Sequence, residues 1–208
     1  MSIPADTIAL NRQRYRLTAA DRVWVFGYGS LIYKVDFPHG AARPAWIRGW
    51  VRRFWQGSHD HRGTPEAPGR VVTLVPDPAG VCVGMAYQVT GDVFEHLDHR
   101  EKNGYLRVRT PLYWGRPADN AQPRPVADSD NLGKADKPHA MVYVAGEDNE
   151  AYLGPAPEAA IARHIAQSRG PSGSNRDYLL QLAAALRELG DPDPHVLAIE
   201  AELLRHQA

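Results

Sequence analysis

Short runs of β-branched and aromatic residues, separated by glycine- and proline-rich stretches, fill the first two thirds of the chain. Such runs, bounded by turn residues, are typical of strands. The pattern predicts strands at 23–26, 47–55, 70–75, 81–89, 105–114 and 139–145. Few long helices separate these runs, so we expect a small mixed β-sheet that is curled or closed into a barrel.

Apolar positions in the last third of the chain recur at helical spacing. One helix is predicted at 158–167. A second is expected to begin at Ser174, because serine followed three residues later by Asp177 resembles a capping box, and to end at Gly190. A third is expected after Asp193, an N-cap residue followed by proline. The predicted fold class is α+β, with helices around the sheet and a helical C-terminal third.

The chain length of 208 residues is that of one ordinary domain with a single core. The first twenty residues are polar and show no period, so we interpret 1–20 as an N-terminal arm and 21–208 as one domain. Within that domain, 115–138 is rich in proline and aspartate and nearly free of large apolar residues. We interpret this stretch as an exposed insertion.

Charge and hydropathy narrow the range of partners. The 24 basic and 24 acidic side chains cancel, which gives no electrostatic footprint for nucleic acid or an acidic membrane. No stretch approaches the roughly 20 apolar residues needed to span a bilayer, and residues 1–18 lack the apolar centre of a signal peptide. We therefore expect a cytoplasmic protein that binds a small molecule.

The single cysteine, Cys82, excludes a disulfide within the chain. Because it lies in the apolar run 81–87, a buried structural thiol is favoured over a nucleophile. The nine histidines contain no His-Glu-x-x-His pattern and are scattered, so no metal site is predicted. Ser30 lacks the Gly-x-Ser-x-Gly elbow of a hydrolase nucleophile.

A loop with two glycines follows the first predicted strand, as Gly27-Tyr28-Gly29-Ser30. Such loops expose several backbone N–H groups in one direction and can bind an anion. The loop lacks the Gly-Lys-Ser/Thr ending of a phosphate loop and the third glycine of a dinucleotide fingerprint. The alternative is a tight turn in which the glycines only permit positive φ and Ser30 caps the next segment.

Glu101 is a candidate acid/base. If 92–102 is helical, Val93, Phe94, Leu97 and Glu101 share one arc, so the carboxylate points inward. A carboxylate in the last helical turn is also unfavourable for the helix dipole. Burial would raise its pKa and suit it to proton transfer near neutral pH. The alternative is a helix that ends early and leaves Glu101 in solvent.

Four blocks in order, at 23–32, 61–74, 100–105 and 170–179, resemble the ChaC family. The resemblance implies a small β-barrel surrounded by helices and cleavage of glutathione to 5-oxoproline and cysteinylglycine without metal or organic cofactor. It places Glu101 at the family's catalytic acid/base. The residues that match the family's substrate-binding loop are Gly27, Tyr28, Gly29, Ser30, Leu31 and Ile32. Further candidate substrate contacts are Tyr105 and Tyr143. Arg62 and Arg70 could attract the glycyl carboxylate of glutathione; the alternative for each is a solvated or structural role.

Three features depart from the family pattern. Asn103 stands where glycine is expected, Tyr33 where tryptophan is expected, and the segment 115–138 is longer. Two alternatives to a glutathione-cleaving enzyme remain: a cyclotransferase for γ-glutamyl amino acids or γ-glutamylamines, and a non-catalytic regulator of cation transport. Glu101 beside the glycine loop favours an enzyme, since a binding module gains nothing from an inward carboxylate.

Overall fold

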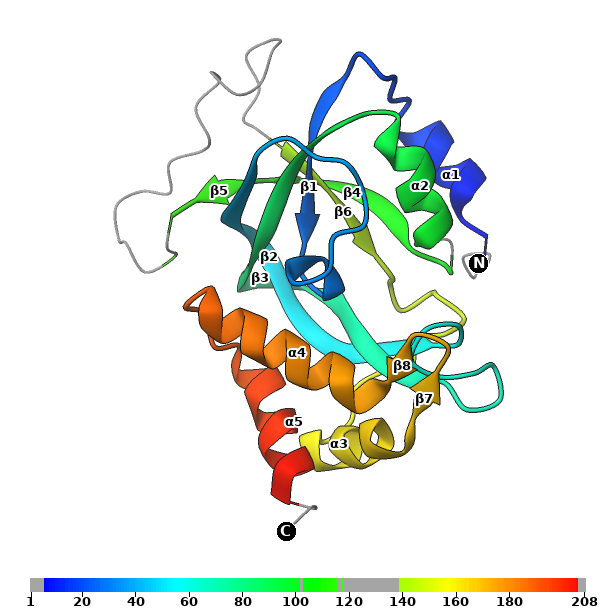
Figure 1. Ribbon diagram of the computed structural model, residues 1–208, viewed down its shortest axis with the longest axis vertical. Helices are drawn as coiled ribbons and strands as arrows, with labels where there is room; N and C mark the ends of the chain where they lie inside the picture. The colour runs from blue at the N-terminus through cyan, green and yellow to red at the C-terminus, as the bar shows by residue number, and fades with distance from the viewer. Residues whose placement is uncertain (1–5, 102, 116, 118–138, 206–208) are drawn as a thin grey trace.

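A six-stranded sheet forms the centre of the protein (Figure 1). The computed structural model describes residues 6–101, 103–115, 117 and 139–205. The sheet order is β4-β6-β1-β3-β2-β5, and all neighbours are antiparallel except β1 and β6. The strands are β1 (Arg22–Gly27), β2 (Ala42–Ser58), β3 (Gly69–Thr90), β4 (Leu106–Pro111), β5 (Tyr113–Trp114) and β6 (His139–Val144).

The sheet is curled into a half-barrel. β4 and β5 are joined only by the buried Leu112, yet they pair at opposite edges of the sheet. The two edges therefore lie close together, which requires strong curvature. This confirms the predicted α+β class and the curled sheet.

Two predicted strand boundaries are wrong. The runs 70–75 and 81–89 belong to the single strand β3, because β2 pairs with both runs and the pairing resumes across 77–80, from Trp50 with Pro76 to Arg48 with Val81. A bulge at Gly49, where φ is +82°, absorbs the irregularity that proline and Gly80 introduce. The run 105–114 splits into β4 and β5.

The helices form two groups (Figure 1). α1 (Ile8–Arg14) and α2 (Val93–Arg100) lie together, and α3 (Glu158–Gln167), α4 (Asn175–Glu188) and α5 (Pro194–Arg205) pack against the long β2–β3 ribbon. A short 3₁₀ helix, η1 (Ser30–Ile32), follows β1, and the hairpin β7 (Arg169–Gly170) and β8 (Gly173–Ser174) precedes α4. Within the residues that the structure describes, no helix is long and apolar enough to cross a membrane.

The three predicted C-terminal helices are confirmed. The hydroxyl of Ser174 accepts a hydrogen bond from the backbone N–H of Asp177 at 3.0 Å, which caps α4 as the sequence indicated. The carboxylate of Asp193 accepts from the N–H groups of His195 and Val196 at 3.1 and 3.2 Å and caps α5 in the same way. Gly190, with φ at +73°, follows the end of α4.

Two apolar clusters fill the two faces of the sheet. Alternate β1 residues point to opposite faces, so Trp24 and Phe26 join the cluster under α3–α5, while Val25 joins the cluster under α2. Cys82 is buried in the first cluster, which confirms the prediction of a buried thiol, and burial raises its pKa to about 11. The glycine loop begins where β1 ends, between the two clusters.

α1 lies inside the predicted N-terminal arm, in contact with β4 and α2. No apolar period indicated this helix, because its buried anchors are the polar residues Thr7 and Asn11. The predicted insertion at 115–138 lies almost entirely outside the described residues.

Candidate active site

A cavity of about 380 Å³ lies between the end of β1, the β2–β3 loop and the end of α2. Its volume is in the range of small-molecule sites, about 300–1,000 Å³. Glu101, Tyr105 and Tyr143 line it together with most of the glycine loop. Segments far apart in the sequence thus bring the predicted candidates to one place.

Five of the six predicted loop residues line this cavity, from Gly27 to Leu31. Ile32 does not, because it lies in η1 and packs against the cluster under α3–α5. A Cβ at Gly27 would lie 2.5 Å from the Cβ of Leu31, and one at Gly29 would lie 3.0 Å from the Tyr178 hydroxyl oxygen. Both glycines therefore allow close approach of the backbone to its neighbours.

The alternative interpretation of this loop is wrong in both parts. Gly29 has φ of −123°, and Gly27 lies in β1, so neither glycine is needed for positive φ. The N-cap of η1 is Gly29 with no side-chain cap, while the Ser30 hydroxyl accepts a hydrogen bond from Arg100 instead. The two glycines therefore allow close packing of the loop backbone next to the cavity; they are not required for a positive φ.

Glu101 is the C-cap residue of α2, and its N–H donates to the Leu97 carbonyl at 2.9 Å. The helix thus ends at Arg100, but the alternative of a solvated Glu101 is wrong, because its side chain is only 20% exposed and lines the cavity. Burial raises the pKa of this carboxyl. Arg100 lowers it, and the negative charges of Asp36 and Asp60 raise it further.

Arg100 connects Glu101 to the glycine loop. Its guanidinium donates to the Asp36 carboxylate at 2.6 Å and to the Ser30 hydroxyl at 3.0 Å, and its Nε lies 3.3 Å from a Glu101 oxygen. Sequence reasoning missed this residue, because a cation in the last turn of a helix is the ordinary preference of the helix dipole. Its position next to Glu101 was the available signal.

Tyrosine side chains line the same cavity as Glu101. Burial, followed by the charge of Glu101, raises the pKa of Tyr28 well above its usual value, and burial is also the main cause of the raised pKa of Tyr105. Both therefore stay protonated at neutral pH. The Tyr28 hydroxyl already donates to the Tyr143 carbonyl at 2.8 Å. The cavity wall thus combines neutral tyrosine side chains with the Glu101 carboxyl.

The two candidate arginines, Arg62 and Arg70, lie in different places relative to the cavity. Arg70 is not at the cavity, because its guanidinium donates to the carbonyls of Phe54 and Gly154 at 2.9 and 3.0 Å, a structural role. Arg62 lines the cavity, donates to the Ser174 carbonyl at 3.0 Å and lies 5.5 Å from the centre of the Tyr178 ring. Of these two arginines, only Arg62 remains a candidate substrate contact.

The segment after Glu101 is fixed by amides that sequence reasoning did not single out as site residues. The side chain of Asn103 donates to the Asp60 carboxylate, a contact that glycine at this position would lack. The buried Asn149 donates to the Asn103 carbonyl at 3.0 Å, and its oxygen accepts from Gln56 and from the N–H of Ala151. In the described part of the chain, no three His, Cys, Asp or Glu side chains form a set that could hold a metal ion.

The model of the family described as ChaC-like protein matches residues 23–206. The chain belongs to the ChaC family. Among its relatives, gamma-glutamylcyclotransferase 2-3 of Arabidopsis thaliana is 43% identical over 88% of this chain and 89% of that protein. Glutathione-specific gamma-glutamylcyclotransferase 1 of Homo sapiens is 43% identical over 85% of this chain and 76% of that protein.

A solved ChaC-type structure supports the fold. The crystal structure of a gamma-glutamyl cyclotransferase specific to glutathione from yeast superposes with a TM-score of 0.75 at 31% identity, and covers 90% of this chain and 100% of that one. The ChaC match begins at residue 23 and therefore leaves α1 outside it.

Proposed function

We propose that this protein cleaves glutathione to 5-oxoproline and cysteinylglycine, with Glu101 as the acid/base. The observation that carries the proposal is the placement of the Glu101 carboxyl in one cavity with the loop Gly27–Leu31. Relatives 41–43% identical that are named glutathione-specific gamma-glutamylcyclotransferases support the choice of substrate.

The proposed reaction is intramolecular. The α-amine of the substrate attacks its own γ-carbonyl, a new C–N bond closes the five-membered lactam, and the amide bond to cysteine breaks. The proton that the amine loses equals the proton that the departing amine of cysteinylglycine gains, so no water or co-reactant is consumed. Folding the γ-glutamyl chain into the attacking geometry is the first task of the cavity, and it can lower the barrier by several kcal/mol.

The second task is proton transfer. The α-ammonium, with a reference pKa of about 8, is mostly protonated at neutral pH and must lose a proton before it attacks. Glu101 accepts this proton as a carboxylate and returns it to the leaving amine. A raised pKa suits the residue to both steps, because a carboxyl of ordinary pKa returns a proton poorly at neutral pH.

The loop completes the proposed site. Backbone N–H groups of Tyr28 to Leu31 and the Ser30 hydroxyl supply donors for the substrate's α-carboxylate or for the charge that develops on the γ-carbonyl oxygen. Arg100 contacts both the Ser30 hydroxyl and the Glu101 carboxylate and so keeps these two side chains close together. Arg62 supplies a cation for the glycyl carboxylate of glutathione at another part of the cavity wall.

The test is a comparison of γ-glutamyl compounds. Purified protein is incubated with glutathione, with a γ-glutamyl amino acid or with a γ-glutamylamine, and 5-oxoproline and the released amine are followed by mass spectrometry. We expect both products from glutathione at the highest rate. Turnover confined to the other compounds would move the substrate to that class. No 5-oxoproline from any of them would contradict a cyclotransferase.

The pH dependence of the reaction gives a further prediction. kcat/KM should rise with pH as Glu101 loses its proton, at a pH above the usual range for glutamate because burial raises its pKa. The charged groups that act on Glu101 are Arg100, Asp36 and Asp60. Replacing Arg100 by glutamine removes the cation that lowers this pKa, so the acid limb of the profile should move to higher pH.

Two variants control this measurement. Arg100→Lys keeps the positive charge and should leave the acid limb near the wild-type position. Asp36→Asn removes an anion that raises the pKa and should move the limb the other way. An acid limb that stays in place in Arg100→Gln would show that Glu101 does not set it.

A further inference from the structure

Residues 6–11 contact the segment that follows Glu101, although they lie outside the family match. Thr7 and Asn11 are both fully buried. The Thr7 hydroxyl donates to the Tyr105 carbonyl at 2.9 Å, and the Asn11 side chain donates to the same carbonyl at 3.0 Å. Asp6 adds a backbone bridge to Asn103. Two side chains from the arm therefore satisfy one buried carbonyl of a cavity-lining residue.

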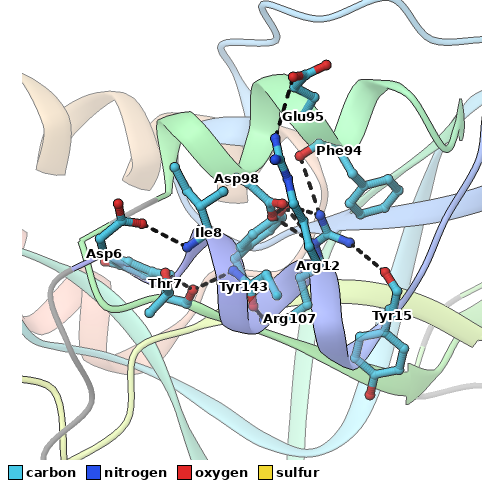
Figure 2. A network of polar contacts seen from close by, with 12 residues as sticks. Asp6, Thr7, Ile8, Arg12, Tyr15, Phe94, Glu95, Asp98, Arg107 and Tyr143 are labelled. Atoms are coloured by element: carbon cyan, nitrogen blue, oxygen red, sulfur yellow. Dashed lines mark hydrogen bonds and ion pairs between the residues drawn. The ribbon is translucent and has the colours of Figure 1, made fainter.

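A second set of contacts continues this attachment along the chain. The Asn11 oxygen accepts from the backbone N–H of Arg107 at 2.8 Å, and the carbonyl of Tyr15 accepts from the Arg107 guanidinium at 3.2 Å. Figure 2 shows that guanidinium beside Asp98 and Tyr143, with Tyr15 on its other side. The arm thus contacts alternate residues, 103, 105 and 107, at the start of β4.

This attachment bears on the cavity because of where Tyr105 lies. Its side chain lines the cavity, and the charge of Glu101 contributes to the raised pKa of its hydroxyl after burial and Tyr28. The arm holds the backbone of the same residue. Loss of the arm contacts would leave the Tyr105 carbonyl buried without its two donors, so the backbone of the segment would shift to find others.

We propose that Thr7 and Asn11 are positioning residues for the reaction, which hold the backbone of Tyr105 and so fix the segment between Glu101 and Tyr105 in the cavity. This inference rests on the proposed function. A displacement of about 1 Å at a reacting centre can cost a hundredfold in rate. The arm contacts described above reach residues 103, 105 and 107, so binding of the substrate at the glycine loop should change less than its turnover.

The experiment uses the full chain with Thr7→Val, which removes the hydroxyl at nearly constant shape, and Thr7→Ser, which keeps it. A Thr7→Val/Asn11→Ala double variant removes both donors. We expect kcat to fall about fivefold in Thr7→Val and about fiftyfold in the double variant, with KM within about threefold of wild type. Thr7→Ser should restore kcat to within about twofold.

A stability control separates positioning from simple loss of folding. Val196→Ala lowers stability in α5, away from the arm, and should keep the wild-type kcat at a temperature where every variant is fully folded. Arm variants that lose stability to the same degree but keep wild-type kcat would overturn the proposal.

Hydrogen exchange gives a readout that does not depend on activity. Backbone amides in 103–108 should exchange faster in Thr7→Val and in the double variant than in wild type, while those of α3 and α5 stay unchanged. Unchanged exchange in 103–108 would overturn the proposal even if the wild type cleaves glutathione. Conversely, a wild type without cyclotransferase activity would contradict the proposed function, and faster exchange would still show that the arm holds this segment.

Discussion

Replacement of Glu101 by glutamine is expected to lower kcat for 5-oxoproline formation from glutathione by roughly a hundred- to ten-thousandfold. Glutamine has nearly the same shape and can still form hydrogen bonds, but its amide can neither accept the ammonium proton nor return it to the leaving amine. The carboxyl is partly buried and lines the cavity. KM should change much less, because the loop Gly27–Leu31 is left intact. The measurement is steady-state kinetics with mass-spectrometric detection of both products.

A matched variant makes this result specific. Glu188→Gln makes the same chemical change on an exposed residue at the end of α4 and should leave kcat within about twofold of wild type. Thermal unfolding should show that Glu101→Gln is folded. A folded Glu101→Gln variant that keeps more than about a tenth of wild-type kcat would rule out Glu101 as the acid/base.

Replacement of Asp98 by asparagine is expected to lower the free energy of unfolding by roughly 3–5 kcal/mol. Asp98 and Arg107 form an ion pair whose side chains are 0% and 3% exposed, and the Tyr143 hydroxyl donates to the same carboxylate at 2.7 Å. Asparagine removes the negative charge and leaves the buried guanidinium of Arg107 uncompensated. Urea unfolding at constant pH measures the change, provided that the m-value stays constant.

A double-mutant cycle gives the control. Asp98→Asn combined with Arg107→Met removes both charges, so the double variant should lose less stability than the two single losses added together. Tyr143→Phe removes one hydrogen bond and should cost only about 1–3 kcal/mol. A loss below about 1 kcal/mol in Asp98→Asn would show that this buried pair contributes little to the stability of α2 and β4.

Local patterns in the sequence determined several features of this protein. The helices at 158–167, after Ser174 and after Asp193 were predictable, because caps and apolar spacing act within a few residues along the chain. The inward position of Glu101 followed from the arc that it shares with Leu97, four residues earlier in the chain, although α2 itself ends at Arg100. The glycine loop was recognisable because Gly27 and Gly29 lie two residues apart at the end of an apolar strand.

Only the tertiary structure decided the long-range features. Prolines and Gly80 marked a break in the sequence, but pairing with β2 keeps β3 as one strand, and register depends on the partner strand. The split of 105–114 depends on sheet curvature, which brings the two opposite edges close enough for Leu112 alone to join β4 to β5. Neither the register between strands nor the curvature of the sheet can be read from a local sequence pattern.

The polar contacts of the site depended on tertiary structure for the same reason. Arg100 resembled an ordinary helix-end cation until folding placed Ser30 and Asp36 against it. Thr7 and Asn11 resembled parts of a polar arm until folding buried them against Tyr105. A polar side chain shows its partner only in space, because a hydrogen bond depends on distance and direction between groups that are here 64 to 98 residues apart in the chain. Apolar periodicity and helix caps, by contrast, act between neighbours in the sequence and can be read from the sequence itself.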